Sequence, residues 1–207
     1  MTARKTARKE FDFYPTPRSA ARVVFDFLAR QDIEECPSML DPAAGDGALI
    51  RAGRDWRPEA HWSAIEIDGR HEGALEEHAE FVQIDNALTC EWPWDTHVVA
   101  NPPFRELDEF WAKLSEHRIR HATWCAMFHP VAWWSAEKRR HLAVRPDFML
   151  ALGWRPKFHP QAGAAHKPMQ DFAWSVLAPV AERCTRWERV ERPDEVPQLT
   201  LLRGGGR

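Results

Sequence analysis

Short apolar runs alternate with longer amphipathic segments along most of this 207-residue chain. Runs of about four to eight apolar residues are typical of buried strands, whereas apolar positions three and four residues apart indicate helices. Strands are expected at residues 39–40, 61–68, 81–85, 97–100, 122–128, 148–152 and 172–177. Helices are expected at residues 18–31, 48–54, 70–79, 106–118 and 136–144. The alternation predicts an α/β fold, in which a seven-stranded, mostly parallel sheet carries helices on both faces.

The two ends of the chain differ in composition from its middle. Residues 1–10 are basic and polar, so we expect a flexible N-terminal arm. Residues 11–178 hold all the expected strands and helices and should form one domain, with Ser19 able to cap the first helix. The last two strands have no evident helix between them, so the C-terminal strand should be antiparallel. Residues 179–207 are charged and end in a glycine run, which predicts a polar tail.

The composition is that of a soluble globular protein, with 44% hydrophobic and 29% charged residues. No apolar run reaches the roughly 20 residues of a membrane helix, and the N-terminus has no hydrophobic signal segment. The four cysteines form no Cys-x-x-Cys pair, so reduced thiols in a cytoplasmic protein are expected. His117 and His121 could share a helix face, but no third ligand lies near them in sequence, so no metal site is predicted.

The net charge of −3 gives no general electrostatic reason to expect nucleic-acid binding. Basic residues do cluster in the N-terminal arm and at residues 138–141. Beside the second cluster, Trp133 and Trp134 supply the combination of aromatic and basic side chains that single-strand binders use. Core packing of the tryptophans and a solvated basic surface explain the same residues, and both interpretations stay open.

A glycine turn follows the first expected strand, in the sequence Asp41-Pro42-Ala43-Ala44-Gly45-Asp46-Gly47. Gly45 and Gly47 carry no side chain, so a ligand can approach the backbone closely. Dinucleotide sites require a third glycine for close packing of helix on strand, and Ile50 stands at that position here. The turn therefore argues against a nicotinamide cofactor.

Acidic residues end the next two expected strands. Glu66 lies 21 residues after Gly45, where a carboxylate can accept hydrogen bonds from both ribose hydroxyls of an adenosyl group. Asp85, with Asn86, can reach an adenine amino group at the end of the third strand. Because the carboxyl ends of parallel strands share one edge of the sheet, these residues predict an adenosyl-binding site there.

Asn101-Pro102-Pro103-Phe104 directly follows the fourth expected strand. An exocyclic aromatic amine is a poor nucleophile, because its lone pair is delocalised into the ring. The side-chain oxygen of Asn101 and the backbone carbonyl of Pro102 could accept both amino hydrogens and favour the pyramidal nitrogen that attacks. The prolines fix these acceptors in place, and Phe104 offers a flat face to an extruded base. A rigid structural turn is the alternative explanation.

In these motifs the chain resembles class I S-adenosylmethionine-dependent methyltransferases, specifically small phage- and prophage-type adenine-specific DNA methyltransferases. Residues 13–17 (Phe-Tyr-Pro-Thr-Pro) are similar to the N-terminal cofactor motif of that family, and residues 41–49 to its glycine motif. Glu66 and Asp85 match its ribose- and adenine-binding acids, and Asn101–Phe104 its catalytic (D/N)PP(Y/F/W) motif. The resemblance covers about residues 11–178.

The resemblance implies a Rossmann-like class I methyltransferase fold, S-adenosylmethionine as the cofactor, and methyl transfer to an exocyclic amino group of adenine in DNA. The residues that it places at the cofactor are Tyr14, Thr16, Pro17, Asp41, Pro42, Ala43, Gly45, Gly47, Glu66, Ile67, Asp85, Asn86 and Asn101. The catalytic residues that it implies are Asn101, Pro102, Pro103 and Phe104. No cysteine lies in the catalytic loop, so methylation of a ring carbon through a covalent adduct is not expected.

Other assignments stay open. Enzymes with this type of tetrapeptide also methylate RNA bases or protein glutamine, and a catalytically silent cofactor-binding subunit would keep the same fold. A nicotinamide oxidoreductase is disfavoured by the glycine turn. Because only residues 179–207 follow the last expected strand, we expect no separate target-recognition domain, so a protein partner could supply recognition. The target sequence, the methylated base and the oligomeric state are not predicted.

Overall fold

The chain folds around one sheet, and the computed structural model describes residues 14–35, 37–135, 142, 144–158, 170–182 and 184–193. The strands are β1 Ser38–Asp41, β2 His61–Glu66, β3 Phe81–Ile84, β4 His97–Ala100, β5 Cys125–Pro130, β6 Phe148–Leu152, β7 Phe172–Leu177 and β8 Arg186–Val190. The α-helices are α1 Arg18–Leu28, α2 Ala48–Trp56, α3 Glu72–Glu76, α4 Leu107–His121 and α5 Val131–Trp134. Two 3-10 helices, η2 Gly69–His71 and η3 Phe104–Glu106, precede α3 and α4.

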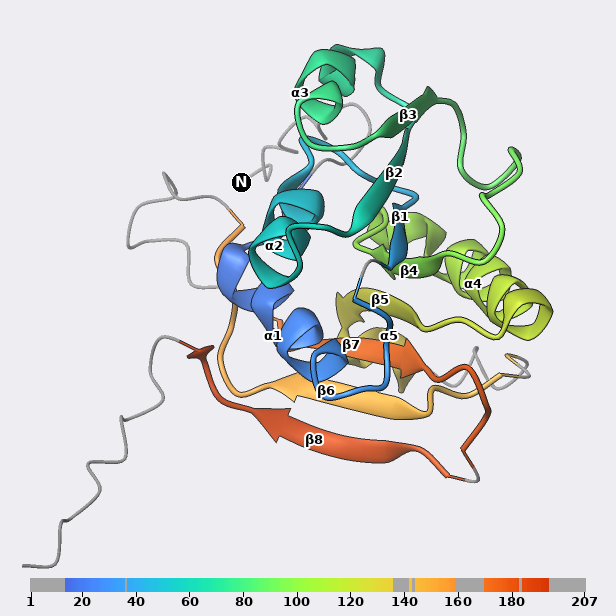
Figure 1. Cartoon of the computed structure of the whole chain (residues 1–207). Helices are drawn as coiled ribbons and strands as arrows, with labels where there is room; N and C mark the ends of the chain where they lie inside the picture. Colours follow the sequence, from blue (N-terminus) through green and yellow to red (C-terminus); the bar gives the residue numbers. More distant parts are fainter. Residues whose placement is uncertain are drawn as a thin grey trace, which may run out of the picture.

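The strands pair in the order β3-β2-β1-β4-β5-β7-β6-β8 (Figure 1). β7 runs antiparallel to both of its neighbours, β5 and β6. The other recorded pairs are parallel. The predicted α/β fold is therefore confirmed, with a mostly parallel sheet and an antiparallel strand near the C-terminus, and all seven predicted strands are present.

The sheet has one strand more than the sequence predicts. β8 lies inside residues 179–207, where a polar tail is expected, and pairs in parallel with β6 at the edge of the sheet. Its side chains are exposed or half-buried, and Trp187 is 58% exposed. An edge strand needs only one hydrogen-bonded neighbour and can keep charged side chains. The apolar pattern that identifies the other strands is therefore missing from β8.

Two apolar cores cover the two faces of the sheet, because successive residues of a strand point to opposite faces. Met39 belongs to the core under α1 and α2, whereas the next residue, Leu40, belongs to the core under α4. Trp62 and Trp174 are fully buried in the first core, and Trp111 in the second. Helices therefore cover both faces, as predicted (Figure 1).

The sequence predicts where helices begin and end less accurately than it predicts strands. Pro17, rather than Ser19, is the N-cap of α1, and no side chain caps that end. The fixed φ of a proline suits a helix start, and the Pro17 carbonyl accepts hydrogen bonds from the backbone N–H groups of Ala20 and Ala21 at 2.8 and 3.0 Å. The predicted arm at 1–10 and most of the predicted helix at 136–144 lie outside the described residues.

Candidate active site

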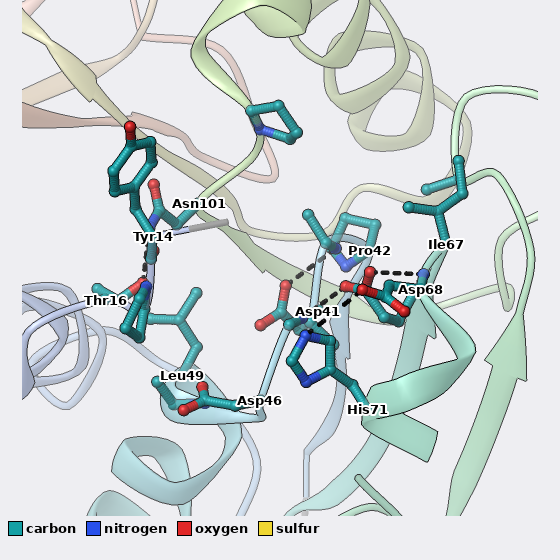
Figure 2. A pocket seen from close by; sticks show the side chains of 18 of the residues that line it. Tyr14, Thr16, Asp41, Pro42, Asp46, Leu49, Ile67, Asp68, His71 and Asn101 are labelled. Carbon is teal, nitrogen blue, oxygen red and sulfur yellow. Dashed lines mark hydrogen bonds and ion pairs between the residues drawn. The ribbon is translucent and has the colours of Figure 1, made fainter. Parts of the chain in front are cut away.

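The carboxyl ends of four neighbouring parallel strands open onto one cavity (Figure 2). β1 ends at Asp41 and β2 at Glu66, while Asp85 and Asn101 directly follow β3 and β4. The space of the cavity, including the part open to solvent, is about 760 Å³. Parallel α/β sheets bind ligands at this edge. The cavity is the principal candidate for the active site.

Most of the predicted site residues line this cavity. They are Tyr14, Thr16, Asp41, Pro42, Ala43, Gly45, Glu66, Ile67, Asp85, Asn86, Asn101 and Pro103. Four predicted residues are not in its wall. Pro17 and Gly47 are the N-caps of α1 and α2, Pro102 is buried, and Phe104 packs among aromatic rings beside the cavity.

Further lining residues are not among the individually predicted site residues, although five of them lie within the predicted motifs at residues 13–17 and 41–49. They are Pro15, Ala44, Asp46, Ala48, Leu49, Asp68, His71, Ala87, Glu106 and Phe110. Asp68 has a visible signal, because it is the second acid after β2, two positions beyond Glu66. His71 has none, because its position depends on η2, which interrupts the predicted helix at 70–79.

The cavity wall is acidic. Its carboxyl groups belong to Asp41, Asp46, Glu66, Asp68, Asp85 and Glu106. Among the described residues of the wall there is no Lys or Arg, and His71 is the one basic side chain. Concentrated carboxylates give a cleft a negative potential, which favours a ligand with a cationic group.

The Glu66 side chain is hydrogen-bonded to the backbone of the glycine turn. Its Oε2 accepts a hydrogen bond from the backbone N–H of Gly45 at 2.6 Å, and its Oε1 accepts one from the N–H of Asp68 at 2.8 Å. Gly45 and Gly47 have φ angles of 52° and 79°, in the left-handed region that favours glycine. The carboxylate is 9% exposed, so this buried charge fixes the shape of the cavity floor through backbone amides.

Asp41 is the first residue of the same turn and is 1% exposed. Its Oδ1 accepts a hydrogen bond from the backbone N–H of Ala43 at 3.1 Å. The pKa of Asp41 is raised to about 8, chiefly by burial; the hydrogen bond from Ala43 opposes the increase, and the nearby charges of Glu66 and Asp46 add to it. Asp41 is therefore protonated at neutral pH, which reduces the repulsion among the buried acids.

Asp68 shows the opposite behaviour. Nε of Arg70 donates to both of its carboxylate oxygens, at 2.8 and 2.9 Å. Hydrogen bonding to Arg70 lowers the pKa of Asp68 to about 2. Nε2 of His71 lies 4.0 Å from Oδ2 of Asp68, so this ionised carboxylate places the imidazole at the cavity (Figure 2).

Asn101 lies on the other side of the cavity, beside Tyr14 and Thr16 (Figure 2). Its Nδ2 donates to the Thr16 hydroxyl oxygen at 2.9 Å and to the Tyr14 backbone carbonyl at 3.2 Å. Its Oδ1 is buried, and no group of the described residues donates a hydrogen bond to it. A buried acceptor without a donor is costly to a fold and is usually explained by function.

Phe104, three residues after Asn101, belongs to an aromatic cluster. Its ring lies nearly parallel to that of Tyr14, with 9° between the planes and 6.3 Å between the centroids. Phe158 meets Phe104 edge-on at 6.3 Å, and Phe172 packs against it at 5.7 Å. The cluster joins the N-terminal segment, the loop after β4 and the β6–β7 region into one aromatic surface.

The remaining sequence candidates lie away from this cavity. His117 and His121 have ring centroids 4.6 Å apart on α4, and no cluster of potential metal ligands is found in the described residues. Trp133 is buried and donates to Oδ1 of Asp108 at 2.7 Å, so it is a core residue; the basic cluster at 138–141 lies outside the described residues. The described cysteines are free thiols. No described helix is both long and apolar enough to cross a bilayer.

Comparison with known proteins identifies the fold. No protein-family model matches the chain, and no curated protein sequence does. The structure is similar to a modification subunit of a putative type I restriction enzyme from Vibrio vulnificus, at a TM-score of 0.58 and 15% identity over 88% of this chain and 48% of that one. It is similar to the methyltransferase subunit of a type I restriction-modification system from Streptococcus thermophilus, at 0.57 and 13%, over 86% and 47%.

A third similar structure is a putative RNA methyltransferase from Pyrococcus horikoshii, with a TM-score of 0.58, 18% identity, and coverage of 84% of this chain and 91% of that one. The chain thus spans about half the length of the two restriction-system subunits and nearly all of the third protein. These likenesses show that the chain has the Rossmann-like fold of these methyltransferases.

Proposed function

We propose that this chain is an S-adenosylmethionine-dependent methyltransferase that methylates an exocyclic amino group of a nucleobase, with adenine in DNA as the first candidate. The observation that carries the proposal is the Asn101 Oδ1 atom, which is buried beside the acidic cavity with no donor among the described residues. An amino hydrogen of the substrate would satisfy this oxygen. The fold that the chain shares with known methyltransferases supports the same reaction.

The residues of the cavity fit S-adenosylmethionine. The acidic wall complements the cationic sulfonium and ammonium groups of that molecule. The turn at Gly45 allows close approach, while Glu66 and Asp85 stand where ribose hydroxyls and the adenine amino group could donate to them. Tyr14 and Thr16 would contact the methionine end. When bound, the cofactor supplies an electrophilic methyl group on sulfonium.

The described residues would act mainly by position. Asn101 Oδ1 and the Pro102 carbonyl accept the two amino hydrogens, so that the nitrogen lone pair points at the methyl carbon. The substrate nitrogen would take the methyl group in line, S-adenosylhomocysteine would leave, and the methylated amine would lose one proton to solvent. No strong base is required, because orientation and preorganised acceptors lower the barrier.

The aromatic cluster would receive the base. The rings of Phe104 and Tyr14 are nearly parallel, and enzymes that modify bases commonly hold an extruded base by stacking. The face of Phe104 is the proposed platform, and Phe158 would close the edge of the site.

The experiment is a methylation assay with isotopically labelled S-adenosylmethionine on unmethylated DNA, RNA and protein, followed by mass spectrometry of the digested products. Labelled N6-methyladenine from DNA is the expected result, and Asn101→Ala is the matched inactive control. Label in glutamine would refute the substrate class. Binding of S-adenosylhomocysteine without label in any product would instead favour a silent subunit.

RNA is the second candidate substrate, and a specific observation favours it. The similar protein described as a putative RNA methyltransferase matches over 91% of its length, whereas the two restriction-system subunits match over less than half of theirs. Those two proteins are subunits, so a protein partner that supplies target recognition is part of the DNA proposal. The RNA arm of the same assay decides between the two.

A further inference from the structure

We infer that Thr16 is a positioning residue for Asn101: its hydroxyl and the Tyr14 carbonyl together hold the Asn101 amide so that Oδ1 is the acceptor offered to the substrate. The observation behind this inference is that Thr16 and Tyr14 take up the Nδ2 side of the amide while no described residue donates to its oxygen. The inference deepens the proposed function and rests on it for its catalytic consequence.

The Tyr14 carbonyl decides which way the amide points, because it can only accept a hydrogen bond, and the Thr16 hydroxyl then holds the second amide hydrogen. Nδ2 carries two hydrogens, and each has an acceptor: the Thr16 hydroxyl oxygen at 2.9 Å and the Tyr14 carbonyl at 3.2 Å. If the amide were flipped, Oδ1 would face the Tyr14 carbonyl, and two acceptors would meet without a hydrogen between them. The flipped amide would also offer two hydrogens to the substrate, where an amine needs an acceptor.

The segment that makes these contacts is itself held rigidly. Prolines flank Thr16 on both sides, which restricts its backbone to extended conformations. Pro17 begins α1, and the Ala20 carbonyl of that helix accepts a hydrogen bond from the Trp174 indole at 2.9 Å. Thr16 is 8% exposed, so water does not compete freely for its hydroxyl. The segment that holds Asn101 is thus connected through α1 to β7.

The chain contains two asparagines, Asn86 and Asn101, which permits a direct test. Selective labelling of asparagine with ¹⁵N in the side-chain amide would give two pairs of NMR signals, and Asn101→Ser would assign them. In Thr16→Val, which keeps the side-chain shape, the Asn101 pair should shift and exchange faster with solvent, while the Asn86 pair stays in place. Turnover at saturating cofactor should fall at least tenfold, a larger factor than the change in the Kd of S-adenosylhomocysteine.

Two further variants sharpen the test. Thr16→Ser restores the hydroxyl and should recover most of the loss in both readouts. Thr185→Val is the matched control, because its hydroxyl is likewise hydrogen-bonded, as a donor to the Pro146 carbonyl at 2.7 Å, but outside the cavity. It should leave the Asn101 signals and turnover unchanged.

Asn101→Asp separates orientation from simple acceptor strength. A carboxylate is the stronger acceptor, so it should support turnover if acceptor strength is all that matters. If Tyr14 and Thr16 hold the side chain as inferred, the second carboxylate oxygen of the aspartate faces the Tyr14 carbonyl, and turnover should fall at least a hundredfold at neutral pH.

Unchanged Asn101 signals or unchanged turnover in Thr16→Val would overturn the inference, as would an active Asn101→Asp. If the wild-type chain methylates no nucleic acid, the proposed function fails, and the amide signals alone decide whether Thr16 orients Asn101.

Discussion

The two sides of the cavity satisfy their polar groups in opposite ways. On the side of the glycine turn, both oxygens of Glu66 accept backbone N–H groups, and Asp68 is neutralised by Arg70. On the opposite side, the amide of Asn101 has its nitrogen bonded, while its oxygen has no donor among the described residues. Figure 2 shows these two sides facing each other across the cavity.

We infer from this difference that the glycine-turn side binds the cofactor, whereas the Asn101 side acts on the substrate. A carboxylate whose two oxygens each accept a backbone N–H stabilises a fixed surface and still has lone pairs for a ligand, and removing it damages the fold. An acceptor left without a donor stabilises nothing until a substrate arrives, so the fold tolerates its loss. Substitutions on the two sides should therefore have different signatures, one in stability and cofactor binding and the other in turnover.

The largest effect is expected from Asn101→Ala. Turnover should fall at least a hundredfold, because removal of one preorganised polar group from such a site commonly costs about 10²–10³ in rate. The Kd of S-adenosylhomocysteine, measured by calorimetry, should barely change, and the urea midpoint should fall only by the contribution of the two lost Nδ2 hydrogen bonds. A variant that keeps near-normal turnover would show that the two sides do not differ in this way.

Asp41 should make the glycine-turn side sensitive to pH. Its pKa is about 8 in the folded chain, against an ordinary value of 3.8 for an exposed aspartate, so the folded state holds a proton that the unfolded state releases. The free energy of unfolding should therefore decrease as pH rises through this window, by about 1.4 kcal/mol per pH unit. Urea unfolding between pH 6 and 7.5 measures this slope, and Asp41→Asn should reduce it by that amount.

Glu66→Gln tests the two hydrogen bonds by which Glu66 stabilises the glycine turn. A glutamine offers one oxygen and one NH₂ group, so the N–H of either Gly45 or Asp68 meets a donor in place of an acceptor. We expect a loss of about 1–3 kcal/mol in the free energy of unfolding, together with weaker binding of S-adenosylhomocysteine. Glu76→Gln, at an exposed position at the end of α3, is the control and should change neither.

The sequence predicts the cavity better than the contacts within it. Strand ends can be located from apolar runs, so Asp41, Glu66, Asp85 and Asn101 are correctly placed at one sheet edge. That Glu66 binds backbone amides depends on the approach of two distant segments, which no local pattern encodes. The contact of Thr16 with Asn101 spans 85 positions and is likewise invisible in sequence.

Edge and surface features are the other part that sequence patterns miss. β8 has too little buried apolar surface to produce a strand pattern, and His71 reaches the cavity only because η2 turns the chain after β2. Both depend on hydrogen bonds to neighbouring segments rather than on side-chain burial. β7, which is buried on both faces, is predicted at its observed bounds, and β5 is predicted within three residues at each end.

The smallest effect is expected from Gly47→Ala, which probes the turn without touching the cavity wall. The residue has φ of 79° and is the N-cap of α2, and an added Cβ would lie 3.3 Å from Cδ2 of Leu75. Left-handed backbone costs a non-glycine residue about 1–2 kcal/mol, so the free energy of unfolding should drop by that amount, measured in urea. Gly73→Ala is the control, because no atom lies within 4 Å of the point that its Cβ would occupy and it has helical backbone in α3. Alanine is the better helix former there, so stability should rise slightly.

Turnover of Gly47→Ala at saturating cofactor should stay within about threefold of wild type, because the Asn101 side does not depend on this turn. A loss of turnover as large as that of Asn101→Ala, with the fold intact, would mean that the two sides of the cavity act as one unit.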